Sequence, residues 1–146
     1  MALKLHEVLK LRNALHEELD GETVAKKRLN GEIVKVSTKF LYAGRKNIQK
    51  ITSQLEVIVE VEKPIAELVK ERNEILAKYK DEDGNFIADK IKETENEVKP
   101  IIEKIDEISK IVGEMLDEEF EGELNLVDID DMPKEISEPI LLMVRD

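Results

Sequence analysis

Apolar residues recur every three or four positions along residues 24–79 and again along residues 87–115. Positions three and four apart share one face of a helix, so this spacing predicts two long amphipathic helices. An acidic segment at residues 81–85 separates the two tracks. We therefore expect the helices to fold back on each other around a turn at residues 80–86. The tracks consist of Ala25, Leu29, Ile33, Val36, Phe40, Ile48, Ile51, Leu55, Ile58, Ile65, Leu68, Ile75 and Tyr79, then Ile87, Ile91, Val98, Ile101, Ile105, Ile108, Val112 and Met115.

A shorter helix is predicted ahead of the hairpin, at residues 6–19, with Gly21 as its stop. We expect its apolar face to pack against the hairpin. The first long helix should then run over residues 22–79. Gly31 and Gly44 each weaken it by about 1 kcal/mol relative to alanine, so the pattern also allows a break at either glycine. The second long helix is expected over residues 86–120, before Gly122.

Pro64 and Pro100 lie at equal distances from residue 82, inside the predicted turn. In an antiparallel hairpin they would therefore stand at the same level. Each proline removes one helical hydrogen bond and favours a bend. Lysine precedes both prolines and is a poor helix cap, which argues against two new helix starts. We expect a shared bend at this level.

After Gly122, residues 123–130 read as a short extended segment with two competing alternation phases. A lone strand needs a partner, which residues 2–5 or the edge of another protein could supply. Ser137 is expected to cap a final short helix at residues 138–144, with Pro139 in its first turn. Three apolar side chains of that helix should dock on the bundle: Ile140, Leu141 and Val144.

Composition agrees with this outline. The 146 residues are 41% hydrophobic but only 3% aromatic, so the core must be built from aliphatic side chains. Charged residues make up 39% of the chain, which is typical of long helices. We predict an all-α, elongated protein of one domain. It comprises an N-terminal helix (1–20), a bent antiparallel hairpin (22–120) and an acidic C-terminal cap (121–146) with a short extended segment and a small helix.

Charge is distributed unevenly, with a net of +5 over residues 1–50 and −10 over residues 114–146. This asymmetry fits solvated faces, pairing within the chain or head-to-tail association. The basic residues 26–50 are the best candidate for nucleic-acid contact, although the overall charge of −11 argues against it. The acidic tail could instead imitate nucleic-acid phosphates toward a basic partner. The candidate partner-binding residues are Lys26, Lys27 and Arg28 on the basic stretch, and Asp128, Asp130 and Asp131 on the tail.

The sequence offers no clear reaction centre. The absence of cysteine excludes thiolate metal sites and cysteine nucleophiles. The acidic turn fails the register of a calcium-binding helix–loop–helix, because Phe86 and Lys92 fall where glycine and glutamate are needed. His6 and His16 are ten positions apart on one helix, which suits no shared metal. We expect no enzyme activity, no cofactor, no metal, no signal peptide and no membrane-spanning segment.

Four segments of the chain resemble small uncharacterised helical proteins of tailed bacteriophages and prophages. The opening helix reads LHEVLKLRNAL at residues 5–15, and the long helix ends in KYKDEDGN at residues 78–85. A stretch VDI at residues 127–129 precedes a short terminal helix with IS at residues 136–137. The resemblance implies a phage origin, a location in the bacterial host cytoplasm or the virion, and a non-enzymatic role. It transfers no functional residues.

Two functions fit these observations. In the first, the chain is an assembly or virion component whose wide apolar stripe is completed by sister chains, in the manner of a coiled coil. In the second, it inhibits a host defence or DNA-processing protein through the hairpin face or the acidic tail. Both functions require a protein partner or self-association.

Overall fold

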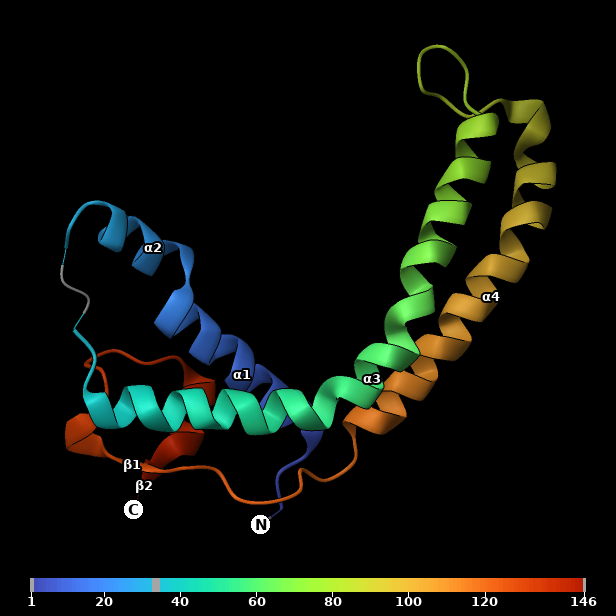
Figure 1. Cartoon of the computed structure of the whole chain (residues 1–146). Coiled ribbons are helices and arrows are strands. Elements are labelled where there is room, and N and C mark those ends of the chain that lie inside the picture. Colours follow the sequence, from blue (N-terminus) through green and yellow to red (C-terminus); the bar gives the residue numbers. More distant parts are fainter. Residues whose placement is uncertain (1, 33–34, 146) are drawn as a thin grey trace. The chain divides into compact units, whose positions relative to one another are not determined.

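The computed structural model describes residues 2–32 and 35–145, and the fold is mainly all-α, as predicted (Figure 1). The chain divides into two compact units. Unit 1 comprises residues 1–56 and 116–146, and unit 2 comprises residues 57–115. The expected outline of N-terminal helix, antiparallel hairpin and small C-terminal elements is present. Each unit is described separately below.

Unit 1 begins with α1 (Leu5–Asp20), which closely matches the helix expected at residues 6–19. Gly21 ends α1, as predicted, and α2 (Glu22–Leu29) follows at once. The next helix, α3 (Thr38–Lys78), contributes its first half to unit 1. Ser37 caps α3, because its side-chain Oγ accepts a hydrogen bond from the backbone N–H of Phe40 at 3.0 Å.

The prediction of one continuous helix over residues 22–79 is wrong, and the break lies at Gly31, one of the two glycines where the pattern allowed it. The helix is interrupted between Leu29 and Thr38, and Gly31 in this interval has a φ of +76°. By contrast, α3 is continuous through Gly44. A Cβ at Gly44 would lie 3.2 Å from Leu19 and 3.4 Å from Leu15, so the missing side chain allows α1 to approach α3. The predicted apolar position Ile33 lies outside the described residues.

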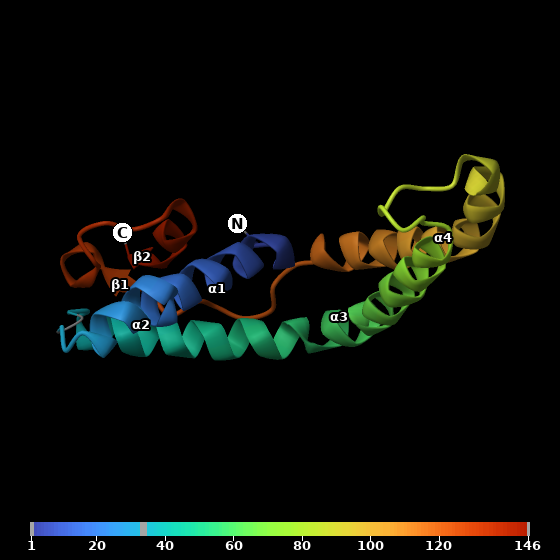
Figure 2. The ribbon, with the colours of Figure 1, turned by 90° about the horizontal axis from the view of Figure 1, so that it is seen from above.

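The best-packed core belongs to unit 1. All eight of the largest fully buried side chains lie there, and seven are apolar. α1 contributes its apolar stripe, α3 contributes buried side chains from Phe40 to Leu55, and the C-terminal elements cover them (Figures 1 and 2). The core is nearly aliphatic, as the composition requires. The eight side chains are Phe40, Leu11, Leu15, Ile51, Ile140, Met143, Val8 and Asn47.

The C-terminal elements are short. They are β1 (Val127–Asp128), the 3-10 turn η2 (Ile129–Asp131), the 3-10 helix η3 (Glu138–Met143) and β2 (Val144–Arg145). β1 pairs with β2 in parallel. The extended segment was therefore predicted correctly, but its partner was not. The partner is β2, because the chain turns back through η3 and brings Val144 beside Val127.

Residues 3–5 pair with a different segment from the one predicted. Lys4 forms an antiparallel bridge with Glu119, immediately after α4. The N–H of Leu5 donates to the carbonyl of Glu118 at 2.8 Å, and the N–H of Phe120 donates to the carbonyl of Leu3 at 2.7 Å. Backbone hydrogen bonds from residues 3–5 thus hold residues 118–120 in place at the start of the C-terminal tail.

The final helix has the expected position, with Ser137 at its N-cap position and Pro139 in its first turn, but it is a 3-10 helix and the Ser137 side chain makes no capping hydrogen bond. Ile140 is fully buried as predicted. Leu141 is 56% exposed, so its predicted docking is wrong, and Met143 is buried in its place. The tighter 3-10 winding, with about three residues per turn, aligns residues 140 and 143 and turns Leu141 outward.

Unit 2 is an antiparallel pair of helices, the second half of α3 and α4 (Ile91–Leu116), which lie side by side in both views (Figures 1 and 2). The short 3-10 turn η1 (Ala88–Lys90) precedes α4. α4 is shorter than the helix predicted at residues 86–120 and does not reach Gly122. The hairpin turn has the expected chemistry, because Gly84 has a φ of +83° and the carboxylate of Asp81 accepts the N–H groups of Asp83 and Asn85 at 2.9 Å each.

Both prolines lie inside continuous helices, Pro64 in α3 and Pro100 in α4. Neither proline starts a new helix, as the poor capping residues before them indicated. The shared bend at this level of the hairpin stays a prediction.

Candidate interaction surfaces

A segment of the tail, residues 121–125, is bound along α3 by side chains rather than by a neighbouring strand. We call this segment the strap. The side-chain amide of Asn47 donates to the carbonyl of Asn125 at 3.0 Å and accepts its N–H at 2.7 Å. Gln54 makes the same two-way pair with Glu121, whose N–H lies 2.8 Å from the Gln54 oxygen. Each side-chain amide therefore makes the two hydrogen bonds that a neighbouring strand would make to the backbone of the strap residue.

Helical spacing makes this arrangement feasible. Asn47 and Gln54 are seven residues apart on one face of α3, a rise of about 10.5 Å at about 1.5 Å per residue. Their partners, Asn125 and Glu121, are four residues apart, which spans about 13 Å in an extended chain. The two long amide side chains can absorb the small difference. The strap consequently runs antiparallel to α3.

Lys50, between the two amides, strengthens the same contact. Its ammonium donates to the carbonyl of Glu123 at 2.9 Å and to the side-chain oxygen of Asn125 at 2.6 Å. Asn47 is fully buried, so its hydrogen bonds satisfy polar groups that water cannot reach. The strap is therefore an integral part of unit 1.

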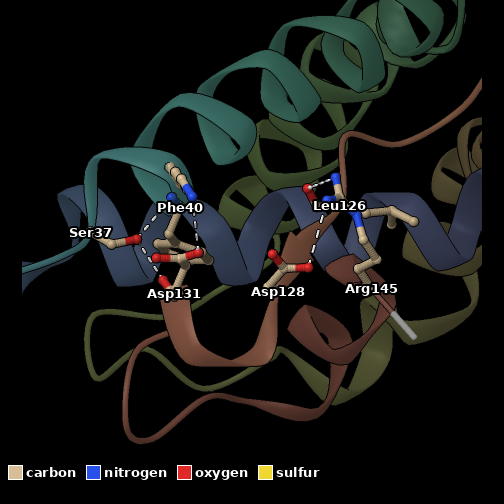
Figure 3. Close-up of polar contacts among 7 residues, drawn as sticks. Ser37, Phe40, Leu126, Asp128, Asp131 and Arg145 are labelled. Carbon is tan, nitrogen blue, oxygen red and sulfur yellow. Dashed lines mark hydrogen bonds and ion pairs between the residues drawn. The ribbon is translucent and has the colours of Figure 1, made fainter.

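Beside the strap lies a hollow of about 400 Å³, lined by the start of α3, β1 and Arg145 (Figure 3). Two ion pairs border it. Lys39 lies 3.7 Å from Asp131, and Arg145 lies 3.6 Å from Asp128. Tyr42 in its lining is 61% exposed. The hollow thus combines an accessible aromatic ring with charges that are already paired.

Two of the three predicted acidic residues, Asp128 and Asp131, are engaged within the chain. Besides the ion pair with Lys39, the backbone carbonyl of Asp131 accepts a hydrogen bond from Ser37 (Figure 3). Asp130 is exposed in η2, and no ion pair joins it to a described residue. The tail therefore offers less free negative charge than its sequence indicates.

The predicted basic residues Lys26, Lys27 and Arg28 are grouped on α2 and are exposed. In residues 2–32 and 35–145, none of them forms an ion pair, and none contacts the acidic trio through a salt bridge. The next residue, Leu29, is 86% exposed. α2 thus presents an unpaired positive charge next to an apolar side chain.

Most other cations of the basic stretch 26–50 serve the fold of unit 1. Arg45 forms a two-pronged pair with Asp20 at 2.6 and 2.7 Å. Lys39 and Lys50 hold the tail, as described above, and the Lys46 ammonium lies 5.7 Å from the centre of the Tyr42 ring. These contacts weaken the prediction that the stretch binds nucleic acid.

The hairpin of unit 2 leaves apolar side chains accessible, most of them beside its apolar stripe. Beyond Ile58, no apolar side chain on α3 is fully buried. On α4, only Val98, Ile101 and Val112 are buried apolar residues. Apolar side chains that stay exposed by 41–63% in this unit are Val57, Val59, Phe86, Ile87, Ile91, Ile102 and Ile111.

Polar contacts at the surface shift several pKa values. The hydrogen bond from Arg45 holds the pKa of Asp20 below its ordinary value. A hydrogen bond to Glu97 raises the pKa of Tyr79, near the end of α3. The side chains of Lys4 and Asp117 are paired at 2.9 Å. Their hydrogen bond raises the pKa of Lys4 and lowers the pKa of Asp117.

Sequence reasoning missed Asn47 and Gln54. The two amides lie seven positions apart with Lys50 between them, so they form a polar row beside the apolar stripe. This row could have indicated a bound segment, but nothing in the sequence identifies the strap as its partner.

Comparisons of the chain with protein-family models, with curated proteins and with solved structures found no match. Within the part of the chain that the structure describes, no helix is both long and apolar enough to cross a membrane. Across the same residues, no group of three potential metal ligands gathers at one place. Within the described residues, neither His6 nor His16 belongs to such a group.

Proposed function

We propose that this chain is a non-enzymatic protein–protein interaction protein that acts by self-association. One observation carries the proposal. Unit 1 encloses a tightly packed core, whereas the hairpin of unit 2 leaves several isoleucine and valine side chains partly in water. Monomeric proteins rarely expose contiguous apolar surface without a binding role. A second copy that covered this face would remove it from water.

In this role the chain would be an assembly component, in which unit 1 supplies a stable fold and the hairpin of unit 2 supplies the surface for association. The phage origin, and with it a place in the bacterial cytoplasm or the virion, rests on the resemblance of the four sequence segments alone. Self-association is a separate proposal and does not depend on that origin.

The proposal is tested by placing charge on the hairpin face. Ile102 and Ile111 are 41% and 42% exposed and lie on opposite sides of α4, nine residues apart. Ile102→Asp with Ile111→Asp therefore places a charge on each side of the helix, and it should leave the fold intact and abolish self-association. Leu141→Asp is a matched control on unit 1, at a side chain that is 56% exposed. Sedimentation velocity should show loss of the larger species for the hairpin variant only. If all three proteins sediment alike, the hairpin face is not the contact.

The alternative function, inhibition of a host protein through the acidic tail, is supported by the hollow at the start of α3. Tyrosine and arginine are over-represented at binding hot spots, and Tyr42 and Arg145 both line that hollow. A pulldown from bacterial lysate with wild-type and Tyr42→Ala protein tests this role. Retention of one host protein by wild type, competed off by DNA, would favour mimicry of nucleic acid.

A further inference from the structure

The hairpin of unit 2 contains a notch of about 340 Å³ between α3 and α4, at the level of Pro64. Its lining includes three apolar residues, Pro64, Leu68 and Ile108. It also includes the carboxylates Glu67, Glu71 and Glu107 and one cation, Lys104. We call this the Pro64 notch. It offers an apolar surface with a mainly negative lining.

The negative charge of the notch is unsatisfied. In the described ranges, 2–32 and 35–145, none of the three carboxylates belongs to an ion pair. All three residues are exposed. Unit 2 as a whole holds 16 acidic and 10 basic residues, a net charge of −6. A symmetric contact between two such notches would bring like charges together, so a basic partner suits the notch better.

The chain carries a feature of the opposite kind on α2. Lys26, Lys27, Arg28 and Leu29, here called the α2 knob, combine three cations that form no ion pair with any described residue and a leucine that is 86% exposed. Lys26 and Leu29 are three residues apart and therefore share a helix face. Val24 of the same helix is buried and anchors it to unit 1. The knob is thus opposite to the notch in charge, and both surfaces include apolar side chains.

We propose that, in the self-association described above, the α2 knob of one copy docks into the Pro64 notch of a second copy. Leu29 would cover Pro64, Leu68 and Ile108, and Lys26 on the same helix face would meet the carboxylates, while Lys27 and Arg28 add positive charge beside the contact. This inference rests on the proposed self-association and names its contact. The contact is heterologous, since it joins two different surfaces, and such contacts build rings or filaments rather than two-fold dimers.

Reciprocal charge reversal tests the contact between copies. The knob variant carries Lys26→Glu, Lys27→Glu and Arg28→Glu. The notch variant carries Glu67→Lys, Glu71→Lys and Glu107→Lys. Each variant alone should associate at least tenfold more weakly than wild type in a sedimentation series. An equimolar mixture should recover association, because the reversed knob of one chain then meets the reversed notch of the other.

Two further proteins serve as controls. Lys10→Glu with Lys78→Glu and Lys92→Glu makes the same change of net charge at exposed sites outside the knob and should associate like wild type. Leu29→Asp should weaken association without disturbing the fold, because Leu29 contributes little to any core. Far-UV circular dichroism confirms that each variant is folded.

The outcomes separate the two proposals. Wild-type protein that is monomeric at every concentration would overturn self-association and the knob contact together. Association of wild type that survives both reversals would overturn only the knob contact. Weakening in both variants without recovery in the mixture would also overturn it, because the reversed surfaces would then not face each other across copies.

Discussion

Asn47 on α3 holds Asn125 of the strap by two opposed hydrogen bonds, one to the carbonyl at 3.0 Å and one from the N–H at 2.7 Å. The Asn47 side chain is fully buried. A helical side chain therefore satisfies both backbone groups of an extended residue that has no strand beside it. This pair fixes the path of the tail across unit 1.

Asn47→Ala should accordingly destabilise unit 1 by about 2–3 kcal/mol, because it leaves a donor and an acceptor of Asn125 without partners. Urea unfolding followed by circular dichroism measures the change. Asn96→Ala is the matched control on α4, where the asparagine is exposed and no hydrogen bond to its side chain is formed with a described residue. The control should change stability by less than about 0.5 kcal/mol. Equal effects of the two substitutions would contradict a structural role for the amide pair.

Ile140 and Leu141 are neighbours in η3 with opposite environments, since Ile140 is fully buried and Leu141 is 56% exposed. Ile140→Ala should cost about 2–5 kcal/mol through the cavity it leaves, whereas Leu141→Ala should cost well under 1 kcal/mol. In a Tyr79→Phe background, tyrosine fluorescence can assign the effect, because Tyr42 then reports on unit 1 alone. A larger effect at Leu141 would show that the short helix is turned the other way.

The Asp20–Arg45 pair predicts a pH dependence of stability. The folded-state pKa of Asp20 lies below its unfolded value, so the pair stabilises the protein above the unfolded pKa of about 3.9 and the effect is lost as pH falls through the folded pKa. Both side chains are more than a third exposed, so solvent screening limits the contribution to roughly 0.2–1 kcal/mol. Asp20→Asn should therefore unfold more easily at pH 7 and match wild type near pH 2. A stability difference that persists at pH 2 would argue against this pair as its source.

Tyr79 and Glu97 are joined by a hydrogen bond of 2.5 Å near the turn of the hairpin. The bond holds the phenol in its neutral form and so raises the pKa of Tyr79. In a Tyr42→Phe background, where Tyr79 is the only phenol, ultraviolet titration should give a midpoint above the ordinary value of about 10. Adding Glu97→Gln should lower that midpoint. An unchanged midpoint would mean that the two side chains do not meet in solution.

The sequence predicted those parts of the fold that depend on local spacing. Apolar residues three and four apart located α1, α3 and α4, and Gly21 and Gly84 marked a helix end and a turn. The break after Leu29 could not be distinguished from a continuous helix, because a glycine lowers helix stability by only about 1 kcal/mol and tertiary contacts decide the outcome.

Long-range partners were beyond the sequence pattern. Val127 pairs with Val144, and Glu119 with Lys4, and neither match is encoded in the spacing of either segment. The candidate acidic residues illustrate the same limit. Asp128 and Asp131 read as free charges in a net negative tail, but Arg145 and Lys39 neutralise them once the chain folds. Only the structure shows which charged side chains form no ion pair with a described residue, and these include the cations of α2 and the carboxylates of the Pro64 notch.

The most direct test of self-association is the solution mass of the wild-type chain, measured by light scattering after size exclusion across a hundredfold range of loading concentration. The monomer mass is 16.8 kDa. We predict a mass that rises above this value with concentration at low salt, and less steeply at high salt because charge pairs contribute to the contact. A constant mass of one chain at every concentration and salt would contradict the account.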